Sequence, residues 1–226
     1  MTEQLVENEK LVLGIIRNYL NMNRILDPES IIPFIQSRLR ESSIYLTYYA
    51  IELILKSLLN QKLIVKSSKL THDDILINEK RKQIYSHIRD NPGTHFNKII
   101  KELRISNHVV VWHLNILLKF NFIKKEIIDD HETYAIPNVD SKTAELSYYI
   151  SKPKSQKIIS YLRENYIGVS KTKLSADLQM HINTINKYLN ILEDNKIIIK
   201  EQHSKKILYF LNDKLPKIVR VFMIEQ

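Results

Sequence analysis

The sequence contains no cysteine, and it has only three glycines and six prolines in 226 residues. The absence of cysteine excludes disulfides, thiolate zinc sites and cysteine nucleophiles. Three glycines are too few for a phosphate-binding glycine-rich loop, a dinucleotide-binding fingerprint or a β-sandwich with many turns. No apolar run is long enough to span a membrane, and the first ten residues are acidic and polar, unlike a signal peptide. We therefore expect a cytoplasmic protein that does not contact a membrane.

The sequence also lacks the patterns of a catalytic or metal site. Its eight histidines form neither HExxH nor HxH. His108 and His113 are five residues apart on one predicted helix, so they point to different faces. We expect His113 to be buried or half-buried and hydrogen-bonded near the first helix of its unit. The carboxylate pair Asp129 and Asp130 falls at a predicted turn, where turn chemistry explains it. The sequence therefore predicts no enzyme activity, no cofactor and no metal.

Acidic and basic residues are unevenly distributed along the chain. The composition is ordinary for a globular protein, with 44% hydrophobic and 26% charged residues, and the net charge is +9. Residues 1–77 carry 9 basic and 9 acidic side chains, residues 78–150 carry 11 and 9, and residues 151–226 carry 14 and 7. The C-terminal third therefore holds +7 of the net charge. Such a surface favours a polyanion, because neutralising phosphates releases condensed counterions.

An internal repeat organises the sequence. The tetrapeptide LNIL occurs at 114–117 and again at 189–192, an offset of 75 residues, at which Val110 matches Ile185. Each copy reads as three helices followed by a hairpin, with hairpins at about 122–136 and 197–211. Candidate helix caps are Thr94, Ser106 and Ser170. The fold class predicted is mainly α with small β-hairpin wings, in tandem winged helix-turn-helix units.

The first part of the chain is a weaker third copy. Residues 55–66 align without gaps on residues 114–125, and two earlier helical stretches lie at about 7–21 and 28–40. This segment is either a degenerate winged helix or a helical dimerisation segment. We expect three domains, comprising residues 1–77, 78–150 and 151–226, and a homodimer formed through the first.

The third helix of each clear unit has an outward face that is a candidate for reading DNA. In the middle unit, with Val110, Leu114 and Leu117 predicted to be buried, the candidate contacts are Asn107, His108, Val111, Trp112 and Asn115. In the last unit they are Asn183, Asn186, Lys187 and Asn190, with the wing residues Lys200, His203, Lys205 and Lys206. Asparagine can bond adenine through two hydrogen bonds, and lysine can reach a guanine or a phosphate.

The middle unit has a second interpretation. Val111 fits a thymine methyl group and Trp112 fits a sugar or base, but an exposed valine and tryptophan are also typical of a protein–protein contact. The alternative to DNA binding is thus a protein-interaction scaffold of stacked winged helices, of the endosomal-sorting or polymerase-associated type, without sequence-specific DNA binding.

The run NPGTHFNKIIKELRISNHVVVWHLNILLKFNFIKKE resembles archaeal winged-helix transcriptional regulators that carry tandem helix-turn-helix domains. The matching residues are Asn91, Pro92, Gly93, Ser106, Val110, Trp112, His113, Leu114 and Leu117. The resemblance covers residues 79–136 well and residues 154–211 less closely, since Tyr188 replaces the helical histidine there. It implies a sequence-specific regulator that binds double-stranded DNA, with its third helices in the major groove and a basic wing on phosphates.

Overall fold

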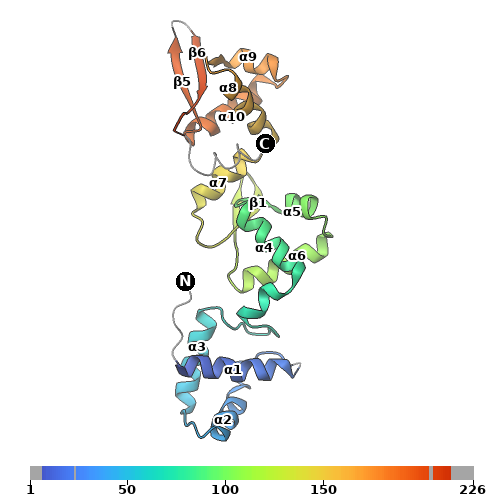
Figure 1. Ribbon diagram of the computed structural model, residues 1–226, viewed down its shortest axis with the longest axis vertical. Coiled ribbons are helices and arrows are strands. Elements are labelled where there is room, and N and C mark those ends of the chain that lie inside the picture. The colour runs from blue at the N-terminus through green and yellow to red at the C-terminus, as the bar shows by residue number, and fades with distance from the viewer. Residues whose placement is uncertain (1–6, 23, 204–205, 215–226) are drawn as a thin grey trace. The chain divides into compact units, whose positions relative to one another are not determined.

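In the computed structural model, residues 7–22, 24–203 and 206–214 are described (Figure 1). The described chain is mainly helical, with two small three-stranded sheets. It divides into two compact units, one formed by residues 1–87 with 97–124 and the other by residues 88–96 with 125–226. This division follows packing rather than the sequence repeat, so the three-domain division stays a prediction.

The N-terminal elements are helical. They are α1 (Glu7–Asn21), α2 (Ile32–Glu41), α3 (Tyr48–Asn60) and the 3-10 helix η1 (His72–Ile77). The three α-helices share one apolar core that includes Ile16, Ile35 and Leu58. Helix α2 begins four residues later than predicted from Pro28, because residues 28–31 form a turn. An isolated antiparallel β-bridge joins Ile64 and Thr71 after α3.

The middle elements follow the order of a winged helix. They are α4 (Glu79–Asp90), β1 (Thr94–His95), α5 (Phe96–Leu103), α6 (Asn107–Lys119), β2 (Lys124–Ile128), β3 (His131–Ala135) and α7 (Ser141–Ile150). The sheet order is β1-β3-β2, and Asp129 and Asp130 at the hairpin turn have φ of 51° and 61°. Two positive φ values at the centre of a two-residue loop match the twist of a hairpin. The predicted hairpin is thus confirmed.

One predicted cap in this region is placed one residue too early. Helix α5 begins at Phe96, so His95 precedes it, and Thr94 lies in β1, where it pairs with Tyr134 and is 3% exposed. The chain enters β1 through Gly93, whose φ is +79° and where a Cβ would lie 2.1 Å from the carbonyl oxygen of Ala144. Ser106 does occupy the N-cap position of α6, without a side-chain hydrogen bond.

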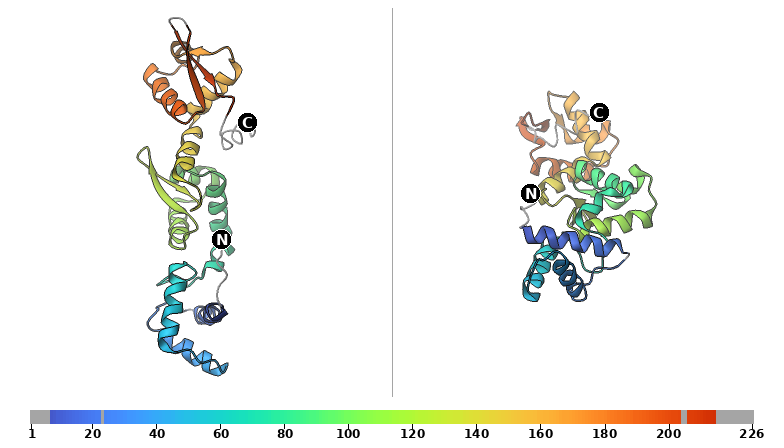
Figure 2. Two further views of the ribbon diagram at one scale, coloured as in Figure 1. Left: turned by 90° about the vertical axis from the view of Figure 1, so that its left-hand side faces the viewer. Right: turned by 60° about the horizontal axis from the view of Figure 1, so that its bottom comes forward.

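The last unit repeats the arrangement. Its elements are α8 (Pro153–Glu164), β4 (Val169–Ser170), α9 (Lys171–Asp177), α10 (Ile182–Asp194), β5 (Ile198–His203) and β6 (Lys206–Leu211). The sheet order β4-β6-β5 is equivalent to β1-β3-β2. Ser170 caps α9 by accepting from the amide of Lys173. Figure 2 shows the β5–β6 hairpin beside α8–α10. The repeat and the predicted fold class, tandem winged helix-turn-helix units, are confirmed.

Candidate nucleic-acid interface

Helix α6 separates buried and exposed residues as predicted. Val110, Leu114 and Leu117 are at most 2% exposed. The predicted contact residues on the opposite face are all exposed, namely Asn107, His108, Val111, Trp112 and Asn115. The indole of Trp112 is the largest of these groups and is 55% exposed. The helix therefore offers a surface that combines polar and apolar groups.

A buried polar cluster lies behind this surface. His113 is 2% exposed, and its Nδ1 accepts from Nε of Arg81 in α4 at 3.4 Å, so the prediction for His113 is confirmed. Burial and the neighbouring charge of Arg81 lower the pKa of His113, which keeps the imidazole neutral near pH 7. Sequence analysis missed Arg81, because nothing in its local pattern distinguishes it from an exposed helical arginine.

Helix α10 likewise has one buried face and one exposed face. Ile185, Leu189 and Leu192 are at most 1% exposed, and Tyr188 is buried beside them. On the outward face Asn183, Lys187 and Asn190 are exposed, while Asn186 is half-buried. This face is more polar than that of α6, and its three asparagines offer both donors and acceptors.

Lys187 has an acidic partner that the sequence did not predict. Its Nζ lies 3.1 Å from Asp129, at the turn between β2 and β3. The same carboxylate accepts from Nζ of Lys152 at 2.6 Å. The hydrogen bond from Lys152 and the bond from Lys187 hold the pKa of Asp129 below its usual value, against the opposing effect of burial. Lys187 must exchange this contact for any phosphate.

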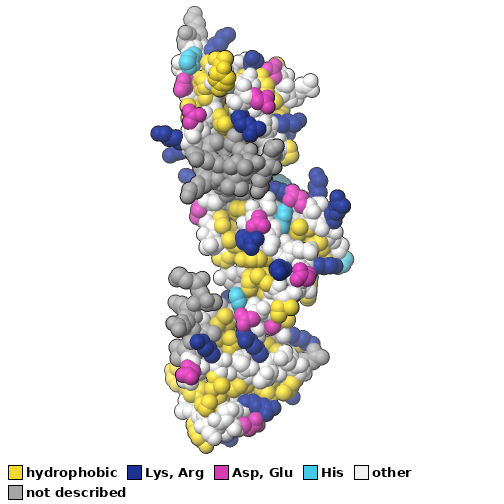
Figure 3. Space-filling view, viewed as in Figure 1, with side chains coloured by type: hydrophobic (Ala, Val, Ile, Leu, Met, Phe, Trp, Pro, Cys, Tyr) yellow, Lys and Arg dark blue, Asp and Glu magenta, His cyan; other side chains and the backbone are white. Residues whose placement is uncertain are grey.

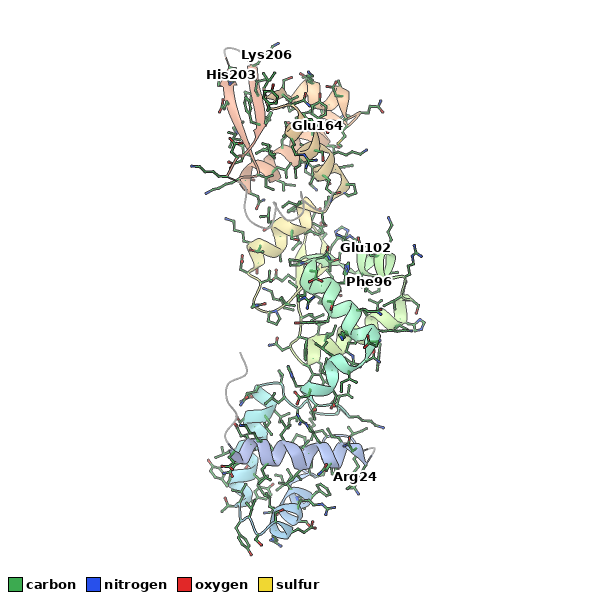
Figure 4. The ribbon with its side chains drawn as sticks, in the orientation of Figure 1. Arg24, Phe96, Glu102, Glu164, His203 and Lys206 are labelled. Atoms are coloured by element: carbon green, nitrogen blue, oxygen red, sulfur yellow. The ribbon has the colours of Figure 1, made fainter. Side chains whose placement is uncertain are left out.

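The β5–β6 wing carries exposed cations, some of them paired. Nζ of Lys200 lies 2.8 Å from Oε1 of Glu193, and Nε2 of His203 lies 3.0 Å from Oε2 of Glu201. Lys206 pairs in register with His203 at the end of the hairpin (Figure 4) and makes no ion pair with a described residue. Lys205 lies outside the described residues. Glu193 therefore offsets part of the wing's positive charge.

In the described ranges, no group of three or more His, Asp or Glu side chains is arranged to hold a metal ion. No helix among the described residues is both long and apolar enough to cross a bilayer.

The middle of the chain matches a known protein family. Residues 78–145 match the family model HTH_HVO_0163_N, described as an N-terminal HTH domain. This stretch contains α4 to β3 and the first half of α7, and thus both helices of the helix-turn-helix. The sequence resemblance to helix-turn-helix regulators is confirmed for this region.

A particular relative is the uncharacterized HTH-type transcriptional regulator MJ1398 of Methanocaldococcus jannaschii, 28% identical over 148 residues. The match spans 66% of this chain and 37% of that protein, so this chain corresponds to little more than a third of its relative. Among solved structures, the endosomal complex ESCRT-II (VPS22/VPS25/VPS36) matches with a TM-score of 0.25 and 14% identity, covering 93% of this chain and 97% of that one. At that TM-score, the likeness supports no conclusion about fold or function.

Proposed function

We propose that this protein is a cytoplasmic, sequence-specific transcriptional regulator that binds double-stranded DNA, and that it is not an enzyme. The observation that carries the proposal is the exposed outward face of α6, which is the third helix of the matched domain and the second helix of its helix-turn-helix motif. In this class of domain that helix enters the major groove and its outward side chains contact base edges. The relative described as an HTH-type transcriptional regulator supports the same conclusion.

The domain of residues 151–226 supplies most of the electrostatic attraction to DNA in this proposal. Helix α10 occupies the major groove, with Asn183, Asn186 and Asn190 reading bases. Side chains of the wing contact phosphates, namely Lys200, His203, Lys205 and Lys206. The net charge of +7 on residues 151–226 supports this assignment. Lys200 and Lys187 then exchange Glu193 and Asp129 for phosphate oxygens.

The middle domain makes the more apolar contact. Val111 is placed against a thymine methyl group and Trp112 against a sugar or a base, with polar contacts from the remaining outward side chains. These are Asn107, His108 and Asn115. The repeated helix-turn-helix pattern supports the same role in DNA binding for α5 and α6 of the middle domain as for α9 and α10 of the last domain.

Salt dependence tests whether the wing contacts DNA. Log affinity falls with log salt by roughly 0.9 per phosphate neutralised, so replacing Lys205 and Lys206 by Ala should reduce the slope by about 1–2 for every sequence. The control replaces the exposed Lys66 and Lys69 of the neutral N-terminal segment and should leave the slope unchanged. Equal slopes for the wild type and the wing variant would contradict DNA binding by the wing. That result would favour the alternative function, a protein-interaction scaffold of stacked winged helices.

A base contact has a different signature. Asn186→Ala should leave the salt slope nearly unchanged and cost about 1–3 kcal/mol on the preferred duplex alone. A uniform loss on all duplexes would show that Asn186 acts on the backbone or on folding rather than on a base.

The N-terminal segment is proposed to form a homodimer. Tyr45, Tyr48, Tyr49 and Leu53 are 47–84% exposed, and apolar side chains reach the surface of this segment in Figure 3. Leu53 lines a groove of about 350 Å³ between α1 and α3. Because residues 1–77 carry no net charge, two copies can approach without repulsion. Sedimentation should show a monomer for Leu53→Glu and an unchanged dimer for Ile77→Glu, and a wild-type monomer would contradict the assembly.

A further inference from the structure

Arg81 is a buried cation whose described partners are all neutral. It lies in the first turn of α4 and is 3% exposed. Nη1 donates to the carbonyl oxygen of Ile75 at 2.8 Å, and Nε donates to Nδ1 of His113 at 3.4 Å. Its Cζ lies 5.5 Å from the centroid of the Trp112 ring. The guanidinium makes no ion pair with any residue that the structure describes.

Stability alone is a poor explanation for an arginine at this position. A buried guanidinium loses its hydration, and neutral acceptors restore only part of the lost free energy. A methionine would occupy a similar volume without that cost. Arginine differs in having several donors in one rigid plane, and here two of them bind different elements while the plane lies near an indole. The side chain therefore holds η1, α6 and Trp112 together.

The contact with His113 extends the support beneath Trp112. Because Nε of Arg81 is a donor, Nδ1 of His113 must accept, which leaves the proton of the neutral ring on Nε2. The His113 ring packs edge-on against the indole, with centroids 4.7 Å apart and planes at 62°. Arg81 and His113 thus contact the inner side of Trp112, while 55% of that residue stays exposed. A supported side chain loses less rotational freedom on binding than a free one.

We propose that Arg81 is a positioning residue for DNA recognition. It holds Trp112 from behind on the outward face of α6, so that the indole meets sugars and thymine methyl groups in a fixed orientation and contributes to sequence preference. The inference rests on the proposed function. It assigns a recognition role to a side chain that itself cannot reach DNA, since it is 3% exposed.

The first test compares two variants of the full chain, Arg81→Met and Lys82→Met. The probes are a duplex of about 30 base pairs, selected by the wild type from a random pool, and a scrambled duplex of the same composition. Arg81→Met should lose on the order of tenfold affinity for the selected duplex only, with an unchanged salt slope, because a buried guanidinium neutralises no phosphate. Lys82→Met removes one charge from the exposed neighbouring residue and should preserve the preference.

The fluorescence of Trp112 provides an independent readout, because it is the only tryptophan in the sequence. Loss of its support should shift the emission of free Arg81→Met to longer wavelength and reduce the response to the selected duplex. Lys82→Met should keep the wild-type spectrum. An unchanged spectrum and preference in Arg81→Met would overturn the positioning role.

A double-mutant cycle separates positioning from a general effect on folding, and it uses Arg81→Lys in case the methionine variant does not fold. If Arg81 acts through Trp112, Arg81→Lys should weaken binding to the selected duplex in the wild type but not in a Trp112→Phe background. Losses that simply add would overturn the inference and leave DNA binding intact. A wild type that binds neither duplex at any salt concentration would instead overturn the proposed function, and the inference with it.

Discussion

Replacing Asp129 by Asn tests the contact between the turn of the β2–β3 hairpin and Lys187 of helix α10. Asp129 is bonded to Lys152 at 2.6 Å and to Lys187 at 3.1 Å. The side chains of Asp129 and Lys152 are 25% and 23% exposed, whereas that of Lys187 is 55% exposed. Asn is nearly isosteric and tolerates the φ of 51° at this position, so the change alters charge rather than backbone conformation.

The expected cost follows from the two bonds. A hydrogen bond that involves a charged group contributes roughly 1.5–3 kcal/mol, and the bond from the Lys152 ammonium to the amide oxygen of Asn, in which only the donor is charged, is expected at about the lower end of this range. The more exposed pair with Lys187 adds at most about 0.5 kcal/mol, because solvent screens it. We therefore expect Asp129→Asn to lower the free energy of unfolding by about 1–2 kcal/mol at pH 7.

The pH dependence has a defined sign. The folded-state pKa of Asp129 is lowered, chiefly by the hydrogen bond from Lys152, so its contribution is complete above the unfolded value of about 3.9. That contribution is lost as the pH falls through the folded-state pKa. Urea unfolding should thus show the largest difference between the wild type and the variant at neutral pH and a vanishing difference in strong acid.

Asp130→Asn is the matched control, because it removes the same charge from the next residue of the turn, where the carboxylate is exposed. It should change the free energy of unfolding by less than about 0.5 kcal/mol. In a salt titration of DNA binding, only Asp129→Asn frees Lys187 and should steepen the slope by about 0.9. If the two variants are indistinguishable in both assays, the reasoning about this contact is refuted.

Three further predictions concern the fold. Leu114→Ala and Leu189→Ala should each lower the free energy of unfolding by about 2–5 kcal/mol in chemical denaturation, and a much smaller loss would mean that these side chains do not fill the cores. Gly93→Ala should cost about 1–3 kcal/mol, because its φ is +79° and its Cβ would clash, whereas Gly14→Ala in open space within α1 should stabilise by about 0.5–1 kcal/mol; a thermal melt that ranks the two the other way would contradict this. Burial raises the pKa of Tyr134 to about 12, so ultraviolet titration should show one phenol ionising well after the exposed ones, and its absence would contradict the burial.

The sequence alone determined the helices and hairpins, because their signals are local. Apolar residues three and four apart placed Val110, Leu114 and Leu117 on the buried side of α6, and the repeat carried the same pattern to α10. The adjacent Asp129 and Asp130 indicated the turn, because aspartate adopts positive φ values more readily than most residues. The exposed face of each helix then followed as the complement of its buried face.

Only the tertiary structure decided which distant groups meet. Strand β1 has two residues and pairs with β3 nearly forty residues later, so Thr94 reads locally as a cap. The contact between Asp129 and Lys187 joins residues 58 positions apart. Arg81 looks like an exposed helical arginine until α6 and η1 cover it. Helical periodicity is a property of neighbouring residues, whereas strand pairing and the partners of buried charges depend on chain segments that only the complete fold brings together.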